Sequence, residues 1–502
     1  MEKDIKQLIE LCTQFAVKKG LCLPADEPLI RNRLLTLFQQ DAPYDGTLPP
    51  LPESLVPILE EMVDYAAENN MLEMNTKTYR DLFDNKICGC LLMMQSQAQE
   101  IFARLYAESP QKATDWFYTL CRDSNYIRTF DIAKNIKYDY PSAYGTLEIT
   151  INLTKPEKDP KEIEKQKAMP QTNYPKCMLC LENVGYGGRL GYPSHETLRT
   201  VPVELDGEPW YFQYSPYVYY NEHCIVFCEK HTPMTMNERK FIRLFSFLKK
   251  FPHYFIGSNT QLPVVGGSIL THEHFQGGRH QMPMEKAAPL FGFSCGDDAV
   301  SCCVVNWPMT CLRLTAAKTE SILPVASKIL KTWQNHSDPD CGIFAFTHGQ
   351  EHNTITPIVR INRAGLYECD IVLRNNLTTD AFPLGVFHPH PDKHNIKKEN
   401  IGLIEVMGLF ILPGRLKTEL EELAQAWVKK EEIAPENIHF SWFNSFKNRF
   451  APQSRQEAMD LIYREVGHVC ENVLKDAGVY KEDAAGRAGV KRFLAACGFE
   501  VE

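Results

Sequence analysis

The residues best suited to chemistry are two histidines and a glutamine that recur at every second position. They are His272, His274 and Gln276, with glycine pairs before them at 266–267 and after them at 277–278. On an extended strand, residues two apart project to the same face, so these side chains would form one polar row. Glycines allow a close approach of the backbone to a ligand, and amide-rich turns suit phosphate oxygens. An imidazole in this row is a candidate nucleophile, general base or metal ligand; the alternative is a pair of surface histidines beside a glycine turn.

A second candidate is the segment Cys177-Met-Leu-Cys180. A Cys-x-x-Cys turn can bring two thiolates to one zinc ion, and the alternative is a pair of unrelated or redox-active thiols. A tetrahedral site needs two further ligands. The downstream candidates are His223, His231, His253, His272, His274 and His280. They are too widely spaced for a zinc finger, so the ligands would have to meet through the tertiary fold.

The glycine-rich segment Gly185-Tyr-Gly-Gly-Arg-Leu-Gly191 gives little support to a common nucleotide fold. It misses the dinucleotide fingerprint, because Leu190 occupies the position of the last glycine. No Gly-x-x-x-x-Gly-Lys-Ser/Thr sequence occurs, so the P-loop interpretation is equally weak.

The elements that must position these residues belong to a large globular chain. Its 502 residues predict about three structural units, at roughly 150 residues per domain. A content of 44% hydrophobic and 23% charged residues excludes disorder, collagen and coiled coil for the bulk of the chain. The formal charge of −9 argues against general nucleic-acid binding through a basic surface. An anionic ligand must therefore be met by a local pocket.

The same composition leads us to expect a cytoplasmic protein. The start Met1-Glu2-Lys3-Asp4 has no apolar stretch of the signal-peptide type after it, and no stretch reaches the ~18 apolar residues of a membrane span. The 17 cysteines are scattered along the chain, which is not typical of a compact disulfide framework.

Apolar spacing indicates a helical start of about 130 residues, a mixed middle and a helical end. Helices are expected within 5–16, 55–66, 241–248, 416–427 and 459–473, and strands within 147–153 and 366–373. The stretch 155–167 is dense in mixed charge and is expected to be a solvated loop or surface helix. The helical start carries no catalytic constellation, and we expect it to pack on the rest of the chain or on a partner.

The quoted residues resemble a known family. The His-x-His-x-Gln pattern resembles the nucleotidylyltransferase branch of the histidine-triad superfamily. More specifically, the segments 177–186, 217–227 and 387–397 look like the class II form of the galactose-1-phosphate uridylyltransferase family, as does the long helical start. The resemblance covers essentially the whole chain, and these long segments are far more specific than the short pattern.

The resemblance implies an α+β fold with two histidine-triad-like antiparallel-sheet units and flanking helices. It implies four regions in chain order. These are a helical N-terminal extension at 1–135, a first unit with zinc site and nucleophile at 136–290, a second unit at 291–450 and a helical C-terminal segment at 451–502.

The resemblance also implies roles for single residues. His274 would be the nucleophile, and Gln276 would hydrogen-bond the α-phosphate. The implied ligands of a structural zinc are Cys177, Cys180, His231 and His272, two thiolates and two imidazoles. The implied substrate-binding residues are Asn221 and Glu222 at the ribose, Asn259, Gly266, Gly267 and Ser268 on the phosphate side, Arg279 as a local positive charge, and Glu405 at the hexose hydroxyls.

Two positions depart from the class I pattern. The proline between the histidines and the glycine before glutamine are replaced here by Glu273 and Phe275. On a strand, the Glu273 carboxylate should point away from the face that carries His274. His388 and His390 could serve a second metal site or orient phosphate, and no iron is assigned.

The implied reaction transfers UMP from UDP-glucose to galactose 1-phosphate through a covalent uridylyl-histidine, with ping-pong kinetics. We expect small-molecule substrates, a structural zinc, no organic cofactor, no nucleic-acid or membrane partner, and a homodimer. One alternative is a histidine-triad phosphorylase or hydrolase that acts on another nucleotide. Another is a zinc-stapled scaffold that binds sugar nucleotides without turnover.

Overall fold

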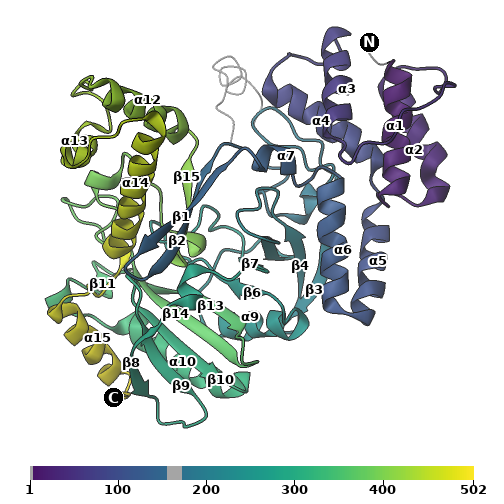
Figure 1. Cartoon of the computed structure of the whole chain (residues 1–502). Helices are drawn as coiled ribbons and strands as arrows, with labels where there is room; N and C mark the ends of the chain where they lie inside the picture. Colours follow the sequence, from purple (N-terminus) through teal and green to yellow (C-terminus); the bar gives the residue numbers. More distant parts are fainter. Residues whose placement is uncertain (1–3, 155–171, 502) are drawn as a thin grey trace. The chain divides into compact units, whose positions relative to one another are not determined.

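The computed structural model describes residues 4–154 and 172–501, which divide into two compact units (Figure 1). Unit 1 comprises Met1–Lys134, Thr154–Val218 and Glu222–His231, and unit 2 comprises Asn135–Leu153, Tyr219–Asn221 and Thr232–Glu502. The chain therefore passes between the units several times. The loop or helix expected within 155–167 lies outside the described residues. The four sequence regions expected above remain a prediction.

Unit 1 begins with helices, drawn in purple to blue in Figure 1. They are α1 (Ile5–Lys18), α2 (Glu27–Leu37), α3 (Val56–Glu68), α4 (Lys77–Leu91), α5 (Gln95–Glu108), α6 (Pro110–Asp123) and the short α7 (Thr129–Ile132). The Asp4 side chain caps α1 by accepting the Lys6 N–H at 3.0 Å. The apolar positions of α1 and α3 that predicted these helices are buried, which confirms both.

The rest of unit 1 holds the antiparallel strands β3 (Val201–Leu205), β4 (Glu208–Tyr214) and β5 (Cys224–Cys228), in the order β3-β4-β5. Helix α6 packs on this sheet through aromatic rings. The Tyr118 and Tyr214 rings meet edge to face, with centroids 4.9 Å apart, and the Tyr214 hydroxyl donates to the Thr114 carbonyl at 3.0 Å. The helical extension thus packs on the rest of its own chain.

Unit 2 contains a long antiparallel sheet in the order β16-β8-β9-β10-β14-β13-β6-β7. Its strands are β6 (Phe255–Gly257), β7 (His274–Gly278), β8 (Pro289–Ser294), β9 (Ser301–Val305), β10 (Cys311–Ala316), β13 (Asn353–Ile361), β14 (Tyr367–Asn375) and β16 (Glu500–Val501). A small hairpin joins β11 (Phe346–Thr347) to β12 (Gln350–Glu351). These antiparallel sheets, with the helices of both units, confirm the α+β class.

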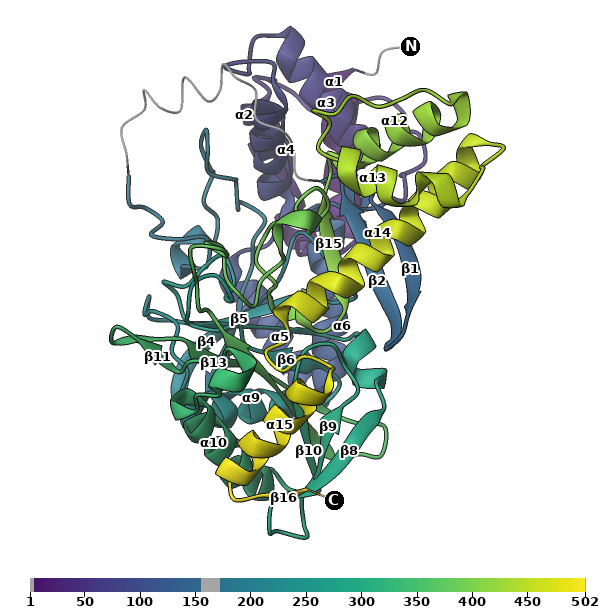
Figure 2. The ribbon, with the colours of Figure 1, turned by 90° about the vertical axis from the view of Figure 1, so that its left-hand side faces the viewer.

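A second sheet of unit 2 contains β1 (Ile136–Ser142), β2 (Gly145–Asn152) and β15 (Leu409–Pro413). Strand β15 is parallel to β2, with Leu409 opposite Glu148. The sheet packs on the long helix α14, and the two lie side by side in Figure 2. The approach is close, because a Cβ atom at Gly467 of α14 would lie 2.2 Å from the Tyr140 ring.

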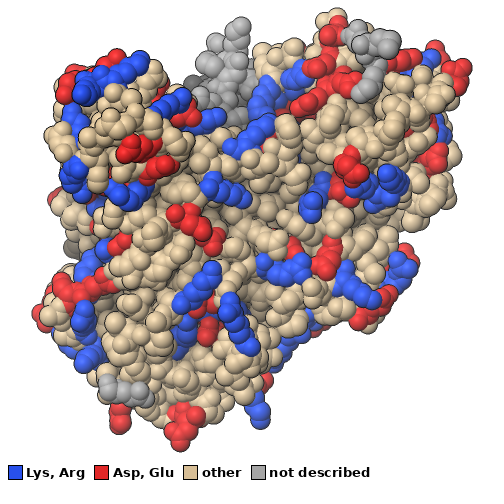
Figure 3. Space-filling view, viewed as in Figure 1, with Lys and Arg blue, Asp and Glu red and all other residues tan. Residues whose placement is uncertain are grey.

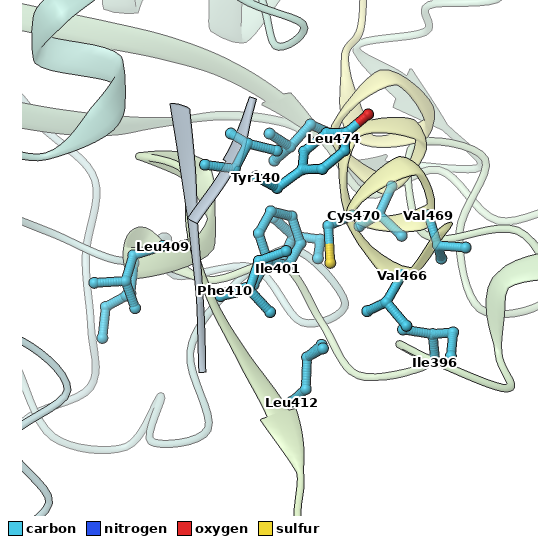
Figure 4. Packing of buried hydrophobic residues seen from close by; sticks show 14 of the residues in the cluster. Tyr140, Ile396, Ile401, Leu409, Phe410, Leu412, Val466, Val469, Cys470 and Leu474 are labelled. Carbon is cyan, nitrogen blue, oxygen red and sulfur yellow. The ribbon is translucent and has the colours of Figure 1, made fainter. Parts of the chain in front are cut away.

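The other helices of unit 2 surround these sheets. They are α9 (Glu238–Lys250), α10 (Thr319–Asn335), α11 (Leu403–Val406), α12 (Leu416–Lys429), α13 (Phe440–Phe446), α14 (Arg455–Ala477) and α15 (Ala484–Ala496). The hydrophobic core brings together side chains from β1, β2, β15, α12 and α14 (Figure 4). The predictions of α9, α12, α14, β2 and β14 are confirmed.

The charges on the surface are of both signs, as the 54 basic and 63 acidic residues of the sequence lead one to expect. On the face shown in Figure 3, basic and acidic side chains are interspersed. Among the described residues, no helix is both long enough and apolar enough to cross a membrane.

Candidate active site and metal-ligand group

Strand β7 of unit 2 carries His274 and Gln276. It pairs with β6 so that Gly277 faces Ile256 and Gln276 faces Gly257. A Cβ atom at residue 277 would lie 2.4 Å from the Phe255 carbonyl oxygen, so glycine is required for this close pairing. The strand begins at His274, and His272 lies just before it, so the expected polar row is only partly on the strand.

The ring of His274 is fixed in one tautomer. Its Nδ1 lies 2.8 Å from the carbonyl oxygen of His272, which can only accept a hydrogen bond. Nδ1 therefore carries the proton, and Nε2 keeps its lone pair. Burial lowers the pKa of His274 to about 4, because the low-polarity surroundings disfavour the imidazolium. The side chain is therefore a neutral imidazole near pH 7, with Nε2 as its free nucleophilic atom.

Gln276 offers an unused polar atom close to this ring along the strand. Its Oε1 is buried and has no hydrogen-bond partner within the described part of the chain. Buried polar atoms are normally paired, so an amide in this state fits a contact to a ligand. Phe275, between the two residues, is fully buried.

The loop after β6 contains the residues expected on the phosphate side. The Asn259 Oδ1 accepts the Leu403 N–H at 2.9 Å, and a Cβ atom at Gly267 would lie 2.8 Å from the Asn259 Nδ2. Asn259 and Gly267 are therefore neighbours, and the next residue, Ser268, is exposed. Val264 has a φ of 73°, a left-handed conformation that is strained for a β-branched side chain and typical of functional loops.

Glu405 lies beside this loop, in α11. Its Oε2 accepts the Gly402 N–H at 3.2 Å, and its Oε1 accepts a hydrogen bond from Lys397 Nζ at 3.0 Å. A Cβ atom at Gly402 would lie 3.4 Å from the Asn259 Oδ1 and 3.5 Å from the Glu405 Oε2. Unit 2 therefore brings Asn259, Gly267 and Glu405 together.

The sequence did not single out Arg374, a fully buried side chain at the end of β14. It donates to the Ile401 carbonyl at 2.8 Å and so supports the segment that leads to Glu405. Burial lowers the pKa of Arg374 to about 10. The available signal was an arginine at the end of an apolar strand, since such residues are rarely buried without a role.

Asn221 and Arg279 are joined by one backbone hydrogen bond and one from the Asn221 side chain. The Asn221 carbonyl accepts the Arg279 N–H at 3.2 Å, and the Asn221 amide donates to the Arg279 carbonyl at 3.1 Å. Glu222, the next residue, belongs to unit 1, where it is buried with a φ of 54°.

Unit 1 contains a group of potential metal ligands. The Sγ atoms of Cys177 and Cys180 lie 3.6 Å apart, and the Cys180 Sγ lies 3.1 Å from the His231 Nδ1. Tetrahedral zinc with Zn–S bonds of about 2.3 Å places its sulfurs about 3.8 Å apart, so the sulfur spacing fits zinc. The amide of Asn183 donates to the carbonyls of both cysteines at 2.8 Å, which holds the turn in shape.

His272 is the fourth member of this group of potential ligands. The N–H of Glu273, the residue after His272, donates to the carbonyl of Thr232, the residue after His231, at 2.7 Å. The donor set of two thiols and two imidazoles is one that zinc prefers.

His388 and His390 have other surroundings. His388 lines a cavity of about 480 Å³ with Lys398 and Asn400. His390 donates from Nε2 to the Val386 carbonyl at 3.1 Å, and its ring lies 4.5 Å from the Phe382 ring at a tilt of 30°. Neither belongs to a metal-ligand group among the residues described.

A neutral histidine with an unprotonated Nε2 has the chemistry of a nucleophile. Two family models match the chain. The N-terminal domain of galactose-1-phosphate uridyl transferase matches residues 23–233, and the C-terminal domain of the same family matches residues 247–444. The chain belongs to the galactose-1-phosphate uridylyltransferase family and is an enzyme, a nucleotidyltransferase.

Curated relatives match along nearly their whole length. The galactose-1-phosphate uridylyltransferase of Caldanaerobacter subterraneus subsp. tengcongensis is 46% identical over 99% of both chains. Those of Halalkalibacterium halodurans and Bacillus subtilis are 46% and 44% identical, covering 98% of this chain and 99% and 97% of theirs. Among solved structures, yeast Ap4A phosphorylase Apa2 matches 61% of this chain and 92% of its own, with 14% identity and a TM-score of 0.30.

Proposed function

We propose that the chain exchanges UMP between UDP-glucose and galactose 1-phosphate through a uridylyl group on His274. The Nε2 of His274 attacks the α-phosphorus of UDP-glucose, a P–N bond forms, and the P–O bond to the β-phosphate breaks to release glucose 1-phosphate. A phosphate oxygen of galactose 1-phosphate then attacks the same phosphorus. The P–N bond breaks, UDP-galactose leaves, and Nε2 regains its lone pair.

The hydrogen bond from His274 Nδ1 to the His272 carbonyl carries this proposal. It leaves Nε2 unprotonated and fixes the direction of its lone pair, which is what attack on phosphorus requires. It also stabilises the positive charge that the ring gains when Nε2 bonds to phosphorus, because the carbonyl accepts the remaining N–H.

The neighbouring residues would handle charge and position. The group that leaves in the first step is a sugar phosphate of low basicity, and the group that leaves in the second is the neutral imidazole of His274. Neither needs a proton from a strong general acid, so a neutral amide at Gln276 suffices. Gln276 and the loop at Gly266, Gly267 and Ser268 would bind the phosphoryl oxygens, and one such donor is commonly worth ~3 kcal/mol. We assign Asn259 to the same phosphates, Asn221, Glu222 and Arg279 to the nucleotide, and Glu405 to the hexose hydroxyls.

We also propose that Cys177, Cys180, His231 and His272 hold a structural zinc. The ion would supply positive charge to the two thiolates and tie His272 to the Cys-x-x-Cys turn, while the transfer itself stays with His274. The donor set and the sulfur spacing support this assignment. We further propose a homodimer, which the mass of the native protein in solution tests.

The function is tested with UDP-glucose labelled in the α-phosphate. We expect the protein to take up label at His274 with release of glucose 1-phosphate, and to lose it as UDP-galactose when galactose 1-phosphate is added. His274→Ala should abolish labelling and exchange, and the matched control His253→Ala should retain both. Release of UMP without an acceptor would instead identify a hydrolase. Binding of nucleotide without label or turnover would identify a scaffold.

A further inference from the structure

A buried ion pair lies directly behind the proposed nucleophile, within unit 2. Glu273, between His272 and His274, directs its carboxylate to Lys240 of α9. Its Oε1 lies 2.5 Å from Lys240 Nζ, and the two side chains are only 4% and 0% exposed. The reaction proposed above uses neither residue.

Stability alone does not explain why a buried ion pair is present at this position. Removing two charges from water costs about as much as their attraction returns, so a buried ion pair is commonly no more stable than apolar residues of the same size. Cases in which buried charges are retained for a specific geometry are known. The neighbours of Glu273 indicate which geometry is held here.

One peptide plane connects the ion pair to the nucleophile. The peptide between residues 272 and 273 contains the His272 carbonyl, which accepts the hydrogen bond from His274 Nδ1 at 2.8 Å. It also contains the Glu273 N–H, which donates to the Thr232 carbonyl at 2.7 Å. Any rotation of this plane would move the carbonyl that orients the His274 ring.

The Glu273 side chain restrains that plane from the other side. Its Oε2 accepts the Thr235 N–H at 2.8 Å, while its Oε1 is held by Lys240 and lies 3.8 Å from an Nη atom of Arg243. Lys240 also lies 5.1 Å from the centre of the Phe275 ring, one residue beyond His274. Contacts from α9 and from the 232–235 segment therefore hold the residues on both sides of the nucleophile.

We propose that Lys240 and Glu273 are positioning residues for uridylyl transfer, which hold the 272–273 peptide so that its carbonyl aims the His274 ring at the α-phosphorus. This inference rests on the proposed function. It predicts a loss in the rate of transfer that is separable from any loss of stability or of substrate binding.

The test removes both charges together. Replacing both partners of a buried ion pair by apolar residues is often neutral or stabilising, whereas removing one leaves a buried charge. Lys240→Met/Glu273→Met should therefore unfold close to the parent temperature, although it lacks the carboxylate that holds Thr235. We expect single-turnover labelling by UDP-glucose to slow roughly 10- to 100-fold, the scale of a nucleophile misplaced by about 1 Å. The dissociation constant of UDP-glucose should change by less than about twofold, because ground-state contacts remain.

Two further variants complete the comparison. Lys240→Met/Glu273→Gln keeps an acceptor for Thr235 and should transfer at a rate between those of the parent and the first variant. Lys249→Met/Glu320→Met removes an exposed ion pair between α9 and α10 and should match the parent.

The inference is overturned if Lys240→Met/Glu273→Met folds and is labelled by UDP-glucose at the parent rate. If that protein does not fold, Lys240→Met/Glu273→Gln takes its place, and labelling of that variant at the parent rate overturns the inference. Absence of label on the parent itself would instead overturn the covalent mechanism, so the two failures are distinguishable.

Discussion

Two regions of the molecule contain clusters of buried or partly buried charged side chains, and they differ in what those charges hold. In unit 2, Lys240 and Glu273 form a pair next to His274. In unit 1, Arg128 bonds with three carboxylates, Asp81 at 3.1 Å, Asp84 at 3.2 Å and Asp131 at 2.9 Å, beside a cavity of about 370 Å³.

The comparison shows that neither a cavity nor buried charge is enough to indicate a functional site. The charges of the Arg128 cluster bond mainly with one another and connect α4 to α7, so they contribute to the fold of the extension. Glu273 instead lies one residue from the fixed, neutral imidazole of His274, and its carboxylate holds the backbone at Thr235. The two regions therefore differ in the partners of their charged side chains.

The largest effect is expected at the site on β7. Gln276→Ala should lower the rate of uridylyl transfer by about 10²–10³-fold, the usual loss when one preorganised donor to a phosphoryl oxygen is removed. The melting temperature should stay near that of the parent. Steady-state exchange and calorimetry measure the two quantities, with Gln281→Ala as the matched control. A drop in stability without a drop in rate would place Gln276 with the structural residues.

A smaller effect is expected at the metal-ligand group. Cys177→Ser should remove bound zinc, measured by elemental analysis, and lower the melting temperature by roughly 5–10 °C, because structural metal sites contribute directly to folding. Labelling of His274 should persist below the melting temperature. Cys90→Ser, in α4, should keep the metal. Unchanged zinc in the Cys177 variant would refute the proposed ligand set.

The smallest effect is expected in the Arg128 cluster and depends on pH. Burial raises the pKa of Asp84 to about 6 from its ordinary 3.8. Between these pH values the folded protein binds a proton that the unfolded chain does not, so this group destabilises the fold as pH rises through the interval. Lowering the pH from 7 toward 4.5 should stabilise the parent relative to Asp84→Asn by ~1–3 kcal/mol.

Hydrogen exchange of the α4 amides at the two pH values measures this difference. Exchange activity at pH 7 should be the same in both proteins. A loss of activity in Asp84→Asn would place the Arg128 cluster with the functional residues and break the comparison.

The sequence predicted the elements whose patterns are local. The apolar spacing of α1, α9 and α14 and the alternation in β2 each report one buried face, which is decided by neighbours within a few turns or residues. The parallel pairing of β15 with β2 was not predicted, because no local pattern specifies which distant strand fills an edge.

The residues of the candidate site likewise divide into those that a local pattern indicated and those that it did not. Spacing alone indicated the Cys-x-x-Cys turn and that Glu273 points away from the face of His274. It left His231 as one of six candidate histidines, which the resemblance singled out, and Glu405 came only from the resemblance. The partner of Glu273 was not found, since Lys240 is 33 residues away in sequence. A signal was present, because Lys240 lies four residues before Leu244, in the apolar stripe of α9, where a charge needs a buried partner.

The parallel pairing of β2 with β15 has a consequence for synthesis on the ribosome. Leu409 is made 409 − 148 = 261 residues after its partner Glu148. At about 5–20 residues per second, the nascent β1–β2 hairpin waits roughly 13–50 s before β15 exists to cover its edge. For that interval it is an open strand edge with an apolar face, the kind of surface that chaperones shield from aggregation.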